Sequence, residues 1–218
     1  MIDTVIFDMD GVIIDSEPLH MEAEQEIFKA LGIAISKEKH GTFVGTSSKN
    51  MWERIIREHS LTIPIDKLLE QNKLSYRKRL AVAVDTAVPG VTELIRALHA
   101  SGFKLAVASS SVPEDIETVL AMFSVRSYFT AVVSGSNVQY SKPHPEIFLM
   151  TAKLLESDPA KCLVIEDSEN GVRAAKSAGM KCIGFQNVNS GNQNLTLADQ
   201  VVNSINEISV DLIKRSPW

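Results

Sequence analysis

From Val88 onward, short apolar runs alternate with amphipathic helical segments, and this alternation constrains the fold more than any other feature of the sequence. The apolar runs are "KLAVAS", "FTAVVS", "KCLVIE" and "KCIGF". Strands that are apolar throughout and alternate with helices are typical of a parallel sheet covered on both faces. The opening run "TVIF" joins this sheet, because the helical segment after it offers no partner strand. The sequence therefore predicts an α/β fold, a Rossmann-like parallel sheet within three α/β/α layers.

Residues 15–87 interrupt this alternation with a purely helical pattern. Apolar residues recur at helical spacing between Leu19 and Leu31, and Gly32 ends that run as a C-cap. Two further helical patterns cover residues 49–59 and 65–84. We expect this segment to form a small bundle of helices.

The chain is thus expected to form two domains. The α/β core comprises residues 1–14 and 88–218, and the helical cap comprises residues 15–87, inserted after the first strand. A chain of 218 residues is long enough to bury a substantial core. The two crossings between the domains would act as hinges.

Composition excludes several classes of function. A formal net charge of −5 provides no basic surface for nucleic acid. No run approaches the roughly 18 apolar residues that a membrane-spanning helix needs. The N-terminal sequence has neither the basic start nor the apolar stretch of a signal peptide. We therefore expect a cytoplasmic protein, with no nucleic-acid or membrane partner, and a monomer because no coiled-coil pattern is present.

Polar residues gather where the predicted parallel strands end, which is where such sheets bind their ligands. Carboxylates follow the first and fourth strands, a run of three serines follows the second, and a lysine comes just after the third. Carboxylate oxygens suit Mg²⁺, which offsets their mutual repulsion and allows an anionic phosphate to approach. The residues at these positions are Asp8, Asp10, Ser109, Ser110, Ser111, Lys142, Glu166 and Asp167.

Four motifs in this order resemble those of the haloacid dehalogenase superfamily, within its β-phosphoglucomutase-like and sugar-phosphate phosphatase group. The motifs are "FDMDGV", the serine after "LAVA", "SKPHP" and "VIEDSENG". The resemblance implies that Asp8 is a nucleophile that forms an aspartyl-phosphate, and that Asp10 is the general acid and base. It also implies that Ser109 and Lys142 contact the transferring phosphoryl group. The Mg²⁺ ligands that it implies are Asp8, Asp10, Glu166 and Asp167, directly or through water.

The candidates for substrate binding are less specific. In the group that the chain resembles, the loop "FVGTSSKN" touches the substrate, although it could equally be a simple helix entry. His20 and Glu24 lie four residues apart on the face opposite the apolar residues of their helix, so they are either recognition residues or an exposed polar face. Ser110 and Ser111 are either substrate contacts or loop serines. The loop candidates are Gly45, Thr46 and Ser47.

Two other polar features carry no predicted catalytic role. Asp15, before the first cap helix, is interpreted as a cap or turn residue. The segment 187–194, "NVNSGNQN", is interpreted as a connecting loop without recognisable chemistry.

The most specific hypothesis is a Mg²⁺-dependent phosphatase acting on a small phosphorylated metabolite. β-Phosphoglucomutase is the alternative, but three departures separate the chain from the mutases that it resembles. Ser48 stands where they have an arginine, Val112 and Pro113 stand where they have Lys and Asn, and Glu24 replaces an aromatic residue. A phospho-receiver module is a non-enzymatic alternative, but it needs neither a helical insert nor Asp10.

Overall fold

The computed structural model describes residues 1–43 and 47–215. At Lys37 it describes the backbone but not the side chain. Within the described residues the chain forms two units, one of residues Ser16–Ala83 and one made by the segments before and after it. In the described ranges, none of the helices has both the length and the apolar character needed to cross a membrane.

The α/β unit is built on a six-stranded sheet in the order β3-β2-β1-β4-β5-β6, and every strand pair is parallel. This order is that of a Rossmann-type sheet, so the predicted fold class is confirmed. The strands are β1 Thr4–Phe7, β2 Lys104–Ser109, β3 Ala131–Ser134, β4 Cys162–Glu166, β5 Lys181–Phe185 and β6 Gln200–Val202.

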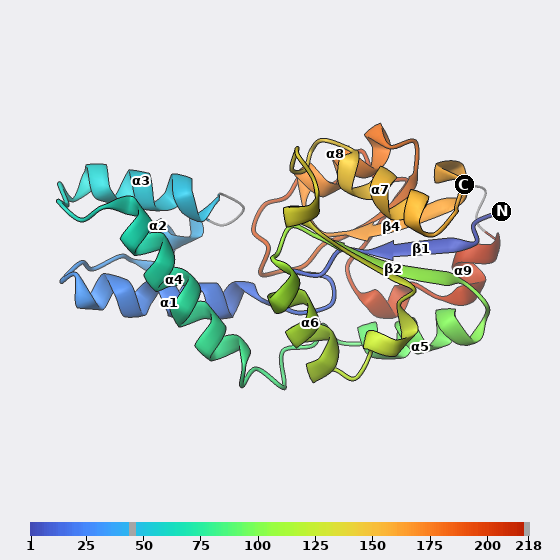
Figure 1. The fold of residues 1–218 in the computed structure, drawn as a ribbon, viewed down its shortest axis with the longest axis horizontal. Helices are drawn as coiled ribbons and strands as arrows, with labels where there is room; N and C mark the ends of the chain where they lie inside the picture. The colour runs from blue at the N-terminus through green and yellow to red at the C-terminus, as the bar shows by residue number, and fades with distance from the viewer. Residues whose placement is uncertain (44–46, 216–218) are drawn as a thin grey trace. The chain divides into compact units, whose positions relative to one another are not determined.

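Helices cover both faces of this sheet, and Figure 1 shows α7 and α8 on one face with α5 and α6 on the other. The strands are buried because their side chains pack against helices in both directions. The helices are α5 Val91–Ala100, α6 Pro113–Met122, α7 Glu146–Leu154, α8 Glu169–Ser177 and α9 Val210–Arg215, with short 3₁₀ turns η1 Arg126–Tyr128, η2 Gly135–Asn137, η3 Pro159–Lys161 and η4 Ile205–Glu207.

The other unit, Ser16–Ala83, is helical in its described part and has its own core. Trp52 is fully buried there among Phe28, Ile55 and Leu68. Glu26 on the first helix accepts hydrogen bonds from Ser75 and Arg79 on the last one. The helices are α1 Glu17–Ala30, α2 Lys37–Gly41, α3 Ser48–Glu58 and α4 Ile65–Leu80.

This helical unit is shorter than the expected insert of residues 15–87, because the chain segments on either side of it pair with each other. Ile14 forms an antiparallel bridge with Ala87, and the Asp15 N–H donates to the Thr86 carbonyl at 2.8 Å. Asp15 and residues 84–87 therefore belong to the α/β unit. Helix α4 also ends at Leu80, before the predicted end at residue 84.

Candidate active site

The candidate site lies at the carboxyl edge of the sheet, between β1 and β4, where the order in which strands are added to the sheet reverses. From β1 the chain continues to β2 and β3 on one side, and then crosses to β4 on the other. Ligands of open α/β sheets bind in the crevice at such a switch point. Asp8 directly follows β1, while Glu166 ends β4 and Asp167 follows it. Phe7 pairs with Ile165, so the shared register brings these carboxylates side by side.

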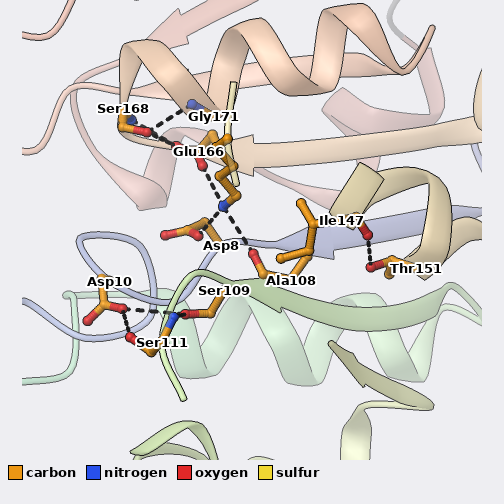
Figure 2. Close-up of polar contacts among 11 residues, drawn as sticks. Asp8, Asp10, Ala108, Ser109, Ser111, Ile147, Thr151, Glu166, Ser168 and Gly171 are labelled. Atoms are coloured by element: carbon orange, nitrogen blue, oxygen red, sulfur yellow. Dashed lines mark hydrogen bonds and ion pairs between the residues drawn. The ribbon is translucent and has the colours of Figure 1, made fainter. Parts of the chain in front are cut away.

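Lys142 joins the strand ends of this site through its ammonium group. Its Nζ lies 2.5 Å from Asp8 Oδ1 and 2.8 Å from Glu166 Oε1, and it donates to the Ala108 carbonyl at 3.1 Å. Figure 2 labels these three partners. The lysine side chain is only 7% exposed and lies over the ring of Phe148. Burial alone would lower the pKa of Lys142, but the Asp8 and Glu166 carboxylates outweigh it and raise that pKa. The lysine is therefore firmly cationic.

Glu166 is fixed by the first turn of α8. Its Oε2 accepts hydrogen bonds from the Ser168 N–H at 2.8 Å and from the Ser168 hydroxyl at 2.9 Å. The same hydroxyl accepts from the Gly171 N–H at 3.0 Å and so caps the helix. A Cβ on Gly171 would lie only 1.6 Å from Glu166 Oε1, so a glycine is required for the carboxylate to lie there. Both oxygens of Glu166 thus have hydrogen-bond donors.

Asp8, Glu166 and Asp167 form a buried group that we call the carboxylate cluster. One oxygen from each lies within 4.8 Å of the others. Burial raises the pKa of Asp8 well above its ordinary value, with Lys142 opposing and Glu166 adding to the effect. Burial and the neighbouring Glu166 carboxylate raise the pKa of Asp167 to about 8. A single lysine therefore does not compensate the cluster, and a divalent cation would.

Asp10 belongs to a second group, formed with the serines after β2 (Figure 2). The Ser111 hydroxyl donates to Asp10 Oδ2 at 2.6 Å, and the fully buried Ser109 hydroxyl lies 3.4 Å from the same oxygen. The Ser111 N–H donates to the Ser109 hydroxyl at 3.0 Å. Asp10 Oδ1 is buried and has no hydrogen-bond partner among the described residues. Ser110 is exposed, so of the three serines only its two neighbours hold Asp10.

The candidates in the helical unit have local roles within that unit. The Ser47 hydroxyl accepts from the Asn50 N–H and caps α3, and the His20 ring stacks on Tyr76 with ring centres 4.0 Å apart. The prediction that Glu24 lies on a polar face opposite the apolar residues of α1 is wrong. Glu24 is buried with those residues because its carboxylate pairs with His40 Nε2 at 2.6 Å. Gly45 and Thr46 lie outside the described residues.

Four polar residues in or beside the site were not predicted from the sequence. Ser168 could have been found, because a serine between a strand and a helix is a typical N-cap. Asn187, Asn189 and Ser190 follow β5, so the strand-end rule applied to the first four strands would have included them as well. Residues 187–194 form a loop, as predicted, but its side chains contact Gly11 and Asp167 of the site. Of the two roles predicted for Asp15, the cap is wrong and the turn stays a prediction. Ser16 is the N-cap residue of α1, and Asp15 accepts a hydrogen bond from Asn189 at 2.6 Å.

The sheet is of the Rossmann type, and its switch point holds the carboxylate cluster, a buried lysine and the group of Asp10 with its serines. This combination is typical of an α/β enzyme with an acidic active site. The sequence profile of the haloacid dehalogenase-like hydrolases matches residues 2–179. The chain therefore belongs to that family and is an enzyme, a hydrolase, as the motifs predicted.

Individual proteins resemble the chain over most of its length. Hexitol phosphatase B of Escherichia coli strain K12 is 32% identical over 206 residues, which are 94% of this chain and 93% of the relative. The phosphorylated carbohydrates phosphatase of Thermotoga maritima is 32% identical over 185 residues, 83% of each chain. The crystal structure of β-phosphoglucomutase from Clostridium difficile superposes with a TM-score of 0.80 at 29% identity, covering 98% of this chain and 96% of the other.

Proposed function

We propose that this hydrolase is a Mg²⁺-dependent phosphatase for a small phosphorylated carbohydrate, acting through an aspartyl-phosphate on Asp8. The observation that carries the proposal is the buried Asp8 carboxylate at the sheet edge, paired with Lys142 and flanked by two further carboxylates. The names of the relatives, a hexitol phosphatase and a phosphorylated carbohydrates phosphatase, support this substrate class.

The donor set of the carboxylate cluster fits Mg²⁺, which binds a few carboxylates together with phosphate oxygens and water. Asp8 and Asp167 would hold the ion directly, and Asp10 through its backbone carbonyl. Since both oxygens of Glu166 already accept hydrogen bonds, we expect this residue to act through a water molecule. When bound, the ion would neutralise and orient the phosphoryl oxygens.

The catalytic work of the chain would be divided between two aspartates. The Asp8 carboxylate attacks phosphorus while the phosphorus–oxygen bond to the carbohydrate breaks. Asp10 protonates the departing oxygen, and then takes a proton from the water that cleaves the aspartyl-phosphate and restores the Asp8 carboxylate. Lys142 stabilises the charge on the phosphoryl oxygens, and Ser109 donates a hydrogen bond to one of them.

Asp10 is arranged for this proton transfer. Ser111 holds one carboxylate oxygen at 2.6 Å, and this leaves the buried, unpartnered Oδ1 for the leaving oxygen or water. Ser111 would therefore orient the acid rather than contact the substrate in this state.

We further propose that the helical unit is a lid that excludes water and supplies specificity contacts. The candidates are His20 and the loop of Gly45, Thr46 and Ser47. Glu24 would have to break its buried contact with His40 to bind a substrate, so it is the weaker candidate.

The test is phosphate release from a panel of hexitol, hexose and pentose phosphates, with Mg²⁺ and with EDTA. We expect turnover of at least one of them, which EDTA abolishes. No release from any member by folded enzyme with Mg²⁺ would overturn the phosphatase proposal.

β-Phosphoglucomutase remains the second candidate, and its structural similarity to this chain is the observation that favours it. A mutase grips a second phosphate, for which a planar guanidinium is better suited than the exposed Ser48 at the start of α3. Conversion of β-glucose 1-phosphate to glucose 6-phosphate, dependent on a bisphosphate primer, would establish the mutase instead.

A further inference from the structure

The loop after β5, residues 186–194, reaches the active site from the side opposite to the serines. We call it the β5 loop. Its side chains form hydrogen bonds with main-chain atoms of two separate segments, the turn after β1 and the start of α8. These segments carry the carboxylates of the cluster.

The first contact of the β5 loop fixes the turn that follows Asp10. Asn187 is 6% exposed, and its Nδ2 donates to the Gly11 carbonyl at 2.8 Å. Its Oδ1 accepts from the Asn189 N–H at 2.9 Å, so both ends of the amide are occupied. Gly11 has a φ of +80°, a conformation that glycine adopts readily. A buried amide is thus used to hold the turn that carries Asp10.

The second contact is made with Asp167 itself. The Ser190 hydroxyl donates a short hydrogen bond to Asp167 Oδ2. A Cβ added to Gly11 would lie 1.9 Å from this oxygen and 3.0 Å from the Ser190 hydroxyl. Gly11, Asp167 and Ser190 therefore meet at one point, and the absence of a side chain on Gly11 makes the room for the other two.

The third contact ties the loop to the helix that follows Asp167. Gln193 Oε1 accepts from the Glu169 N–H at 3.1 Å, and its Nε2 donates to the Ser190 carbonyl at 2.8 Å. Ser190 is thereby held in place by a neighbour in the loop that also binds the first turn of α8.

We propose that Ser190 is a positioning residue that orients the Asp167 carboxylate toward the metal, and that Asn187 and Gln193 hold Ser190 and the Gly11 turn in register for this purpose. The inference rests on the proposed metal site. A hydroxyl that occupies one oxygen of a carboxylate leaves the other directed at the ion, and such supporting contacts typically change metal affinity 10–100-fold, roughly, when removed.

The test measures Mn²⁺ binding by electron paramagnetic resonance, with Mn²⁺ as the probe and no substrate present. Ser190→Ala should bind Mn²⁺ about 10-fold or more weakly than wild type. Ser190→Thr, which keeps the hydroxyl, should restore the affinity. The matched control is Asn194→Ala in the same loop, because Asn194 is exposed and bonds only locally to Thr196; it should bind as wild type does.

The readouts separate positioning from folding. Ser190→Ala should remain folded in EDTA at the assay temperature, although losing a donor to the buried Asp167 lowers its melting temperature, and its kcat should recover at saturating Mg²⁺. Equal Mn²⁺ affinity in wild type and Ser190→Ala would overturn the positioning role while leaving the phosphatase proposal intact. Failure of wild type to bind Mn²⁺ at all would overturn both the positioning role and the metal requirement of the proposed function.

Discussion

The carboxylates at the edge of the sheet and those on the surface of the helical unit have pKa values shifted in opposite directions. At the edge of the sheet, burial raises the pKa values of Asp8 and Asp167. In the helical unit, Glu58 is solvent-exposed, and hydrogen bonds from Arg54 and Lys39 lower its pKa to about 2. The Glu26 pKa is lowered in the same way by hydrogen bonds from Ser75 and Arg79.

This difference separates groups that serve function from groups that serve the fold. The helical unit pairs its surface acids with nearby donors, which mildly favours the folded state. The α/β unit keeps buried acids close together without sufficient compensation, which opposes folding. Proteins retain such clusters where activity requires them, so mutations in the two regions should affect activity and stability differently.

The largest effect is expected at Asp8. Asp8→Asn removes the proposed nucleophile and should lower kcat by at least about 10³-fold. It also removes one negative charge from the carboxylate cluster, so the melting temperature in EDTA should not fall. Phosphate release and differential scanning fluorimetry measure the two quantities.

The control for Asp8 is Asp158→Asn, at an aspartate that caps η3 by accepting from the Ala160 N–H. This variant should retain wild-type kcat. If the Asp8→Asn enzyme turned over at the wild-type rate, Asp8 would not be the nucleophile, and the buried acids at the sheet edge would not be explained by activity.

Lys142 is expected to matter for both activity and stability. Lys142→Met should lower kcat by about 10²–10³-fold, as the loss of a charge-stabilising donor does. Without the lysine, two buried carboxylates lose their cation, so the free energy of unfolding in EDTA should fall by about 3 kcal/mol. Chemical denaturation and steady-state kinetics provide the measurements.

Lys104→Met is the matched control, because the Lys104 ammonium group donates to the Leu155 carbonyl at 2.7 Å, away from the carboxylate cluster. Its kcat should be unchanged. If Lys142→Met were as stable as wild type, the negative charge of Asp8 and Glu166 would not depend on this lysine for its stabilisation.

The buried pair of the helical unit should show the reverse profile. Glu24→Ala leaves the His40 ring without its partner among Phe28 and Phe43, which should destabilise the protein by about 1–3 kcal/mol. Glu24→Gln keeps a hydrogen-bonding group and is the control. If Glu24 is structural, Glu24→Gln should keep kcat/KM; a large loss of kcat/KM at unchanged melting temperature would instead make it a substrate contact.

The sequence was sufficient to predict the sheet and the residues at its first four strand ends. Apolar strands determine the layers, and the carboxyl edge collects whatever polar residues follow them, so Asp8, Lys142, Glu166 and Asp167 could be grouped without coordinates. Glu24 was misjudged because helical spacing cannot reveal that His40, on another helix, offers a buried partner.

The β5 loop was missed for a different reason. Its asparagines and serine resemble an ordinary solvated connection, and their role depends on the position of Gly11, far away in the sequence. Only the parallel pairing of β5 with β4 brings the loop to the carboxylates. The strand-end rule would have selected the loop as a candidate, but local sequence patterns do not record which distant residues it contacts.

The smallest effect should appear in the pH dependence of stability. In EDTA, the melting temperature should fall as the pH rises from about 5 to about 8. Burial and the Glu166 carboxylate raise the folded-state pKa of Asp167 from 3.8 to about 8, so the folded protein holds more protons than the unfolded chain in this window. Deprotonation therefore favours unfolding there. Since Mg²⁺ compensates the ionised carboxylates, its stabilising effect should grow over the same range.

Two variants assign this slope to one region. Asp167→Asn should reduce it in EDTA, because one of the buried acids with a raised pKa is gone. Glu58→Gln should leave it unchanged, since hydrogen bonds from Arg54 and Lys39 lower the pKa of Glu58 to about 2. The stabilisation from Glu58 is complete above its ordinary pKa of 4.5 and is lost only as the pH falls toward 2. A slope that survives Asp167→Asn undiminished would mean that Asp167 does not titrate with a raised pKa in the folded protein, and Asp8, whose pKa burial also raises, would then account for it.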